Sequence, residues 1–478
     1  MRRFCPKSLT THIAVCYRLG LPQAGGSEEN SRTQCDGRSP SPVEETPLMR
    51  SSRFLFGFAL AISLVCPKWS AAQFAPPPSN PPGAGQPPPA APPPVIQPIR
   101  EMPQPGDPAL PAQLSDTLKS ENLLSSADVA QVDSAVSTIC TLLSDEAHPA
   151  NQSACRDWIV LGVTTSNGTP SSAAFLLAYS QSLNNHLLAL VNAPHASIRV
   201  KIYAGLVAAK VADASLNGEM MDLASRLMKD PSPAVVLVGI KAAAPILPAA
   251  MVSIIKAPLA PAFAREIEDA AVRNSAPPLG GRIANAAYNA LEPLYTYANK
   301  LPNLMPMISQ ILVPVALDLE KQRMQLYLKG PPSGIIEDAN GFVGLFAGPI
   351  WTGSASAPGI APPMQAQLLQ AFSDLVGVTA AWAASPNPDA VNDHNNLMAS
   401  LELLGNIMTI FSDPSIGTRP EVGLYTAASL LQSVGPTTPS SAITSDAASM
   451  VAAISTFAKD KVGGAAINPP PSLLAANP

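Results

Sequence analysis

The chain has 478 residues, of which only 13% are charged, and a formal net charge of −5. Residues 1–72 hold nine of the 29 basic and five of the 34 acidic residues, which leaves the rest of the chain at about −9. Its basic residues form no run and are not interleaved with aromatic residues. This composition excludes a phosphate-binding stripe and predicts no nucleic-acid partner.

Residues 49–72 have the layout of a secretory signal peptide. Met49 to Arg53 supplies a basic start, Phe54 to Val65 an apolar core, and Ser70 to Ala72 the small residues that signal peptidase requires. We therefore expect translation to start at Met49, the mature protein to begin at Gln73, and the protein to be exported to the periplasm or the cell surface. We interpret residues 1–48 as an upstream extension outside the translated protein.

A lipid anchor on Cys66 is the alternative fate of this signal. Lipoprotein signals carry a small residue directly before the modified cysteine. Val65 stands there and Pro67 follows, so the sequence favours cleavage over lipidation. No later segment reaches 18 uninterrupted apolar residues, and we expect no stable membrane insertion after the signal is cleaved.

A proline-rich segment follows the signal peptide. It contains 16 prolines between Pro76 and Pro111 and almost no charge. Proline removes amide donors and biases the chain towards polyproline II, so residues 73–113 are predicted to be a disordered linker. Such a linker would hold a folded body away from the membrane or the cell wall.

From Leu114 onward the composition changes to Ala, Leu, Val, Ile and Met at helical spacing, and strand signatures are missing. We expect an all-α fold with a repeat domain over 114–329, a Gly- and Pro-rich loop over 330–363, a C-terminal helical lobe over 364–462 and a disordered tail over 463–478. Helices are predicted over 116–145, 153–164, 170–191, 197–212, 217–229, 233–247, 261–275, 280–299, 303–328, 364–384, 390–412, 420–434 and 442–461.

Two stretches 37 residues apart repeat the order of helix, Pro-containing turn and helix. The first turn is Ala193-Pro194 before Ile198-Arg199, and the second is Asp230-Pro231 before Val235-Val236. This pattern resembles a HEAT repeat, whose turn carries Asp-Pro followed by Val-Arg. The second copy lacks the arginine. Over residues 170–299 the resemblance implies an α-solenoid of stacked antiparallel helix pairs, with an irregular helical bundle as the alternative. It predicts burial of Leu187, Leu190, Ile198, Ile202, Leu227 and Val235.

Two cysteines remain after signal cleavage, Cys140 and Cys155. An even pair in an oxidising compartment predicts a disulfide, which would staple the first helical hairpin across the turn at Asp145 to Pro149. Two unrelated buried thiols are the alternative.

No familiar catalytic motif is present, and we expect neither a cofactor nor a metal. Asp389, Asp393, His394 and Glu402 gather around one predicted helix, where capping and solvation explain them. A solvated face likewise explains Glu266, Glu268 and Asp269. His186 and His195 have no visible nucleophile beside them. Trp158, Trp351 and Trp382 are typical of core residues, with a groove lining as the alternative.

These observations predict an exported, non-catalytic helical-repeat protein that binds a protein partner in the cell envelope. So few charges leave apolar surface for contact with another protein. The alternative is an exported enzyme or small-ligand-binding protein with a site between the two helical lobes, near Trp351.

Overall fold

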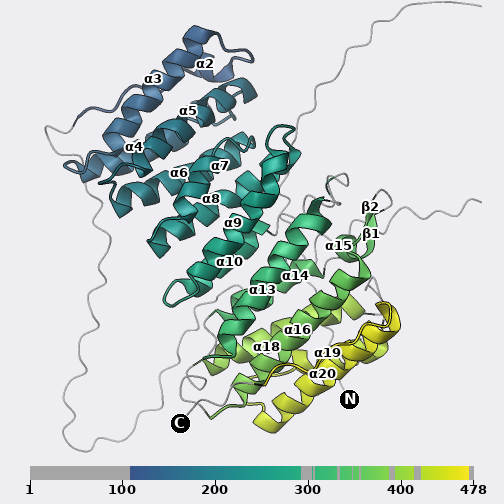
Figure 1. The fold of residues 1–478 in the computed structure, drawn as a ribbon. Helices are drawn as coiled ribbons and strands as arrows, with labels where there is room; N and C mark the ends of the chain where they lie inside the picture. The colour runs from purple at the N-terminus through teal and green to yellow at the C-terminus, as the bar shows by residue number, and fades with distance from the viewer. Residues whose placement is uncertain are drawn as a thin grey trace, which may run out of the picture. The chain divides into compact units, whose positions relative to one another are not determined.

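A computed structural model describes residues 108–291, 304, 307–330, 334–346, 348–354, 357–386, 393–413 and 421–472 (Figure 1). The upstream extension, the signal peptide and the linker as far as residue 107 lie outside the described residues.

The described chain is all-α, as predicted. A single hairpin of two-residue strands, β1 (Gly353–Ser354) and β2 (Ala357–Pro358), is the exception within the described ranges. The helices are α2 (Asp116–Ser120), α3 (Ser126–Leu143), α4 (Pro149–Leu161), α5 (Ala173–Val191), α6 (Ile198–Ser215), α7 (Met221–Met228), α8 (Pro233–Val252), the 3-10 turn η1 (Ala257–Leu259), α9 (Ala260–Arg273), α10 (Gly280–Leu291), the π-helical turn η3 (Ile308–Leu312), α13 (Val313–Tyr327), α14 (Ile335–Leu345), α15 (Gly348–Thr352), α16 (Pro362–Ala383), α18 (His394–Ser412), α19 (Val422–Gln432) and α20 (Ser440–Lys461).

Local chemistry sets where several helices begin. The Ser125 and Asp128 side chains form a capping box at the start of α3, while Ser172 and Ser197 cap α5 and α6. Pro149 and Pro233 occupy the first positions of α4 and α8, where a missing amide hydrogen costs nothing.

Most helices pack on a sequence neighbour and on the helix two places along the chain. One series of contacts joins α3, α5, α7, α9, α13, α16 and α20, each to the next, and a second joins α4, α6, α8, α10, α14, α18 and α19 in the same way. Contacts between the two series pair α3 with α4, α5 with α6, α7 with α8, α9 with α10, α13 with α14, α16 with α18 and α20 with α19.

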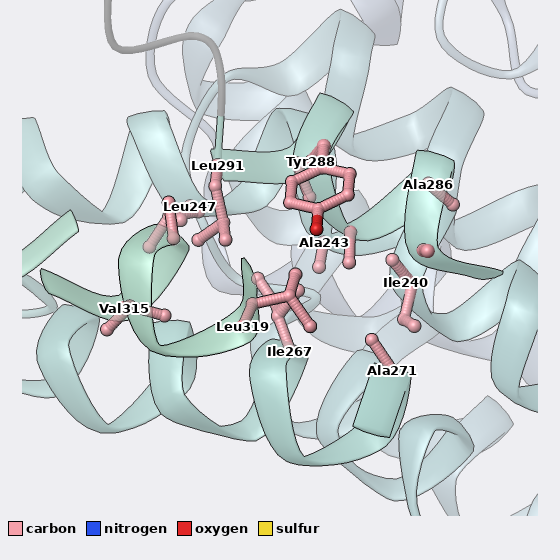
Figure 2. Close-up of a cluster of buried hydrophobic side chains, with 14 of the residues drawn as sticks. Ile240, Ala243, Leu247, Ile267, Ala271, Ala286, Tyr288, Leu291, Val315 and Leu319 are labelled. Atoms are coloured by element: carbon pink, nitrogen blue, oxygen red, sulfur yellow. The ribbon is translucent and has the colours of Figure 1, made fainter. Parts of the chain in front are cut away.

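The core runs between these series. Figure 2 shows one part of it, in which apolar side chains of α8, α9, α10 and α13 meet around Ile240, Ile267, Leu291 and Leu319. Each such side chain stabilises the fold by roughly 1.5–3 kcal/mol when fully buried. Among the described helices, α8 is long and apolar enough to cross a membrane, and 72% of its most apolar window is buried inside the protein.

Five of the six side chains predicted to be buried in the repeat region are wholly or partly buried, and one is not. Leu187, Leu227 and Val235 are fully buried, and Leu190 and Ile202 are partly buried against the core. The prediction for Ile198 is wrong, because this first residue of α6 is 55% exposed. Its first turn projects outward, and Val200 fills the core instead.

The connection expected over 330–363 contains structure. Gly334, with φ +89°, precedes α14, and α15 and the β-hairpin follow. Helix α14 packs on α10, α13, α16 and α18, so contacts continue across the expected boundary between two lobes. The helix expected over 116–145 is also interrupted, because Ser125 caps a new helix after α2.

Both ends of the described body are packed where disorder was predicted. The last residues of the predicted linker contact α4: the Trp158 indole donates to the Pro111 carbonyl at 2.9 Å, and the Asn151 amide donates to the Pro108 carbonyl at 3.2 Å. At the other end, Ala465 and Ile467 of the predicted tail pack against the core. Residues 108–113 of the predicted linker and residues 463–472 of the predicted tail therefore belong to the folded body.

Cys140 and Cys155 are both buried, in the contacting helices α3 and α4, and the structure has them as free thiols. Burial raises the pKa of each thiol to about 12, and the nearby Cys155 adds to the rise at Cys140. Thiols with so high a pKa react slowly, because the thiolate is the nucleophile in disulfide formation.

The predicted disulfide remains testable on the exported protein. Thiol counting after denaturation without reductant should find none per chain if export oxidises the pair during folding. The bridge would close a loop of about 15 residues and stabilise the fold by roughly 3 kcal/mol. Two free thiols per chain would match the structure and contradict the predicted disulfide.

Candidate interaction surface

Exposed apolar side chains gather after the C-terminal end of α8. Ile254 is 96% exposed and Ile255 is 80% exposed, while Val252 and Leu259 on either side are about half exposed. Single exposed apolar residues are ordinary on a protein surface, but contiguous ones mark contact sites.

The turn between α6 and α7 adds another apolar side chain beside this group. Leu216 is 59% exposed and has φ +50°, a left-handed conformation that leucine rarely adopts. Lys256 Nζ lies 3.6 Å from Glu219 Oε2, which ties the turn after α8 to the turn after α6. We call this surface the apolar edge and define it as Leu216, Val252, Ile254, Ile255 and Leu259.

The charges next to the apolar edge compensate each other. Lys256 and Glu219 form the only ion pair recorded there among the described residues, and each side chain is about one-fifth exposed. The surface therefore offers apolar contact area around an ion pair that compensates itself. Covering each isoleucine with a partner would gain roughly 1.5–3 kcal/mol, which is the scale of an interface anchor.

The polar residues predicted around residue 394 do not converge. Asp389 lies outside the described residues, and Glu402 is exposed. Asp393 stands at the N-cap position of α18, but its side chain makes no capping hydrogen bond, which corrects the expectation that capping explains it. Over the described ranges no group of three or more His, Cys, Asp and Glu side chains could hold a metal.

The acidic residues of α9 are not a solvated face throughout, which corrects a second expectation. Glu268 is buried because α13 covers it. It accepts hydrogen bonds from Arg265 at 3.0 Å and from Gln322 of α13 at 2.9 Å. Burial raises the pKa of the Glu268 carboxyl. Arg265 also pairs with Asp318 at 2.8 Å, so the network joins the two helices.

His186 bonds to an acid rather than to a nucleophile. Its Nε2 lies 3.1 Å from Asp133 Oδ1, and the Ser182 hydroxyl donates to the same oxygen at 2.6 Å. A hydrolytic triad requires the histidine to stand between the serine and the acid. Here both side chains bond the carboxylate, and the arrangement joins α5 to α3.

The three tryptophans are core residues in the structure. Trp158 and Trp382 are buried and donate to the Pro111 and Tyr327 carbonyls. Trp351 is 1% exposed and packs on Phe346 and Phe411, with ring centroids 5.6 and 5.0 Å away. The surroundings of Trp351 are therefore aromatic core.

A buried ionic cluster, which the sequence analysis did not single out, lies where α10, α13 and α14 meet. Arg323 Nε donates to Asp338 Oδ1, and the Tyr288 hydroxyl donates to the same oxygen at 3.0 Å. Arg323 Nη2 donates to the Tyr327 hydroxyl at 2.9 Å. Glu320 is also buried, one helical turn before Arg323. Glu320 and Arg323 stand in the polar run Glu320-Lys321-Gln322-Arg323, so no sequence signal indicated their burial.

The cluster buries two carboxyls and one guanidinium, so the single cation can balance the charge of only one carboxylate. Burial raises the pKa of the Asp338 carboxyl, and the Arg323 guanidinium and the hydrogen bonds from Arg323 and Tyr288 oppose that rise. Burial, together with the neighbouring charge of Asp338, raises the pKa of the Glu320 carboxyl well above its usual value. The cluster is a structural junction between three helices.

Replacing Glu320 with glutamine should remove a pH dependence of stability. The unfolded chain ionises Glu320 near pH 4.3, while the folded chain keeps the proton to higher pH, so stability falls as pH rises through that window. In melting curves from pH 4 to 8, the melting temperature of Glu320→Gln should rise relative to that of the parent as pH increases. Glu402→Gln, at an exposed site, is the control. Parallel curves for Glu320→Gln and the parent would contradict the assignment.

No protein-family model matches the chain, and no curated protein matches it.

Proposed function

We propose that this chain is an exported, non-catalytic helical-repeat scaffold that binds a protein partner in the cell envelope through the apolar edge. The observation that carries the proposal is the exposure of Ile254 and Ile255 beside Leu216, on turns that an ion pair joins. An apolar surface on two adjacent turns fits a protein partner with a complementary apolar face.

The proposed architecture is a HEAT-like α-solenoid. It is supported by the two contact series, in which each helix meets its pair mate and the corresponding helix of the next pair. In a solenoid each repeat contacts its neighbours, and corresponding turns line up along one edge. The turns after α6 and α8 occupy corresponding positions, which explains why their apolar side chains gather on one surface.

The sequence features before residue 108 complete the proposal. A signal peptide over 49–72 would export the chain, and a proline-rich linker would separate the body from its point of attachment. The site of action would be the periplasm or the cell surface. N-terminal sequencing of the exported protein should find Gln73 first, and a lipid on Cys66 would contradict this part.

Site-specific photo-crosslinking tests the partner. A photoreactive residue at position 255 should give one discrete protein adduct in the native envelope, because Ile255 points into solvent where the partner would dock. The double variant Ile254→Ser, Ile255→Ser should lose that partner while melting within a few degrees of the parent, since exposed side chains contribute little to stability.

Leu123 supplies the matched control. It is 86% exposed, in the turn between α2 and α3, outside the apolar edge. A photoreactive residue at position 123 should give no such adduct, and Leu123→Ser should retain the partner. Equal adducts from positions 123 and 255, or adducts with lipid alone, would refute a protein-binding edge.

A further inference from the structure

The segment after α20 lies in an open groove between α16 and α20. The groove has a volume of about 460 Å³, and small side chains form its walls. They are Gly377, Ala380 and Ala381 of α16 and Ala447, Ala448 and Val451 of α20. Residues 467–470, which have no helical or strand structure, form a further side of this space.

The side chain of Gln370 forms two hydrogen bonds with the main chain of this segment. The Asn468 amide donates to Gln370 Oε1 at 2.7 Å, and Gln370 Nε2 donates to the Asn468 carbonyl at 3.1 Å. Asp374 accepts from the same amine at 2.8 Å and so fixes which way the carboxamide points. Hydrogen bonds to both the N–H and the C=O of one residue recognise an extended backbone whatever its side chain.

The groove also has a place for a proline ring. A Cβ atom at Gly377 would lie 2.4 Å from Pro470 Cβ and 2.5 Å from its Cγ, so only glycine allows this contact. Pro469, Pro470 and Pro471 have fixed φ angles and no amide hydrogens, so the segment enters the groove already extended and leaves no donor unpaired.

Two glycines connect this segment to α20. Gly463 and Gly464 have φ +64° and +78°, and nothing lies within 4 Å of the Cβ position of either. Their backbone turns the chain back towards α16 without packing against the fold. This turn lies between α20 and the segment, whose Ala465 and Ile467 pack against the core.

From these features we infer that the groove between α16 and α20 is a peptide-binding site, which the chain's own C-terminal segment occupies until a partner displaces it. The partner is a protein with an extended segment in which a branched aliphatic residue and an amide residue precede two prolines, as in Ile467-Asn468-Pro469-Pro470. The site is separate from the apolar edge, and its evidence does not depend on that surface.

Fluorescence anisotropy tests the site. The probe is a labelled synthetic peptide of residues 464–472, added to the full chain and to a chain ending at Gly464. The shortened chain should bind the peptide, and the full chain should bind it at least ten-fold more weakly, because a tethered competitor acts at millimolar effective concentration. Gln370→Ala in the shortened chain, or Pro469→Ala with Pro470→Ala in the peptide, should each weaken binding about ten-fold or more.

If the shortened chain does not fold, hydrogen exchange of the Asn468 main-chain amide in the full chain tests the same site. An excess of the peptide should speed exchange of the Asn468 amide, and the doubly substituted peptide should not. The variant Gly377→Ala should speed it without peptide, while Gly435→Ala, with open space at its Cβ position, should leave it unchanged.

Two results would overturn the inference. The first is a folded, shortened chain that fails to bind the peptide, together with Asn468 exchange that the peptide does not alter. The second is a full chain that is a dimer and becomes a monomer on removal of residues 465–478, which would identify a second copy's tail as the occupant. The variant Ile254→Ser, Ile255→Ser should keep peptide binding, so failure of the apolar edge would not be confused with failure of this site.

Discussion

Replacing Arg323 with methionine should lower the free energy of unfolding by about 3–5 kcal/mol. Arg323 is 1% exposed, and it neutralises Asp338 in a part of the core that also holds Glu320. Methionine fills similar volume but leaves the Asp338 carboxylate buried without its cation, which is the costly way to break a buried pair. Urea unfolding followed by circular dichroism measures the loss.

Two further variants show whether charge or packing is responsible. Lys229→Met removes an exposed partner of Glu266 and should change stability by less than about 1 kcal/mol. Combining Arg323→Met with Asp338→Asn should recover part of the loss, because the buried charge is then gone. Equal losses in the single and the combined variant would show that shape, and not charge, dominates this junction.

Replacing Gly405 with alanine should destabilise the protein by about 1–3 kcal/mol, although alanine is the better helix former. Gly405 lies within α18, where α19 approaches closely. An added Cβ would lie 2.4 Å from the Gln432 amide nitrogen and 2.8 Å from its Cα, so backbone would have to move. Without this contact the substitution would stabilise the helix by roughly 1 kcal/mol. A loss of stability would therefore show that the close contact with α19 outweighs helix propensity.

Gly435→Ala is the matched control for this substitution. Nothing lies within 4 Å of its Cβ position, and its backbone is not in the left-handed region. In thermal melts, the melting temperature of Gly405→Ala should lie well below that of the parent, and that of Gly435→Ala should equal that of the parent. A Gly405→Ala variant as stable as the parent would mean that α18 and α19 separate easily.

The helices were predictable because their apolar residues recur with helical spacing and their ends carry strong signals. Pro233 begins a helix at the predicted position, and Asp230-Pro231 falls in a turn, whereas Pro149 begins α4 four residues before its predicted start at residue 153. Helix α14 was missed, because Gly341 and Gly344 lower its intrinsic helix propensity. Its stability comes from tertiary packing: Gly341 lies against Tyr288 and Glu320, which no local pattern reveals.

The candidate sites were less predictable than the fold. Ile254 and Ile255 fell in an expected connection, where an apolar pair is a usable signal, but their exposure depends on how the two turns meet. Glu320 and Arg323 read as an ordinary surface pair until α10 and α14 cover them. The contact between Gln370 and Asn468 joins residues 98 positions apart, so only the folded chain brings them together.

Residues 108–111 are attached to α4, and this attachment decides where a pulling force on the N-terminal segment would reach the helical part of the protein. A load carried by the preceding segment reaches three hydrogen bonds before it reaches any helix. Asn151 and Trp158 donate two of them, and Gln113 donates the third to the Trp158 carbonyl. Beyond them, helices α3 to α20 hold mainly to their neighbours, so no long-range strand pairing clamps the two ends together. If the helices stack as the proposed solenoid, we expect the chain to yield in small successive steps under tension, which would make it an extensible element as well as a folded one.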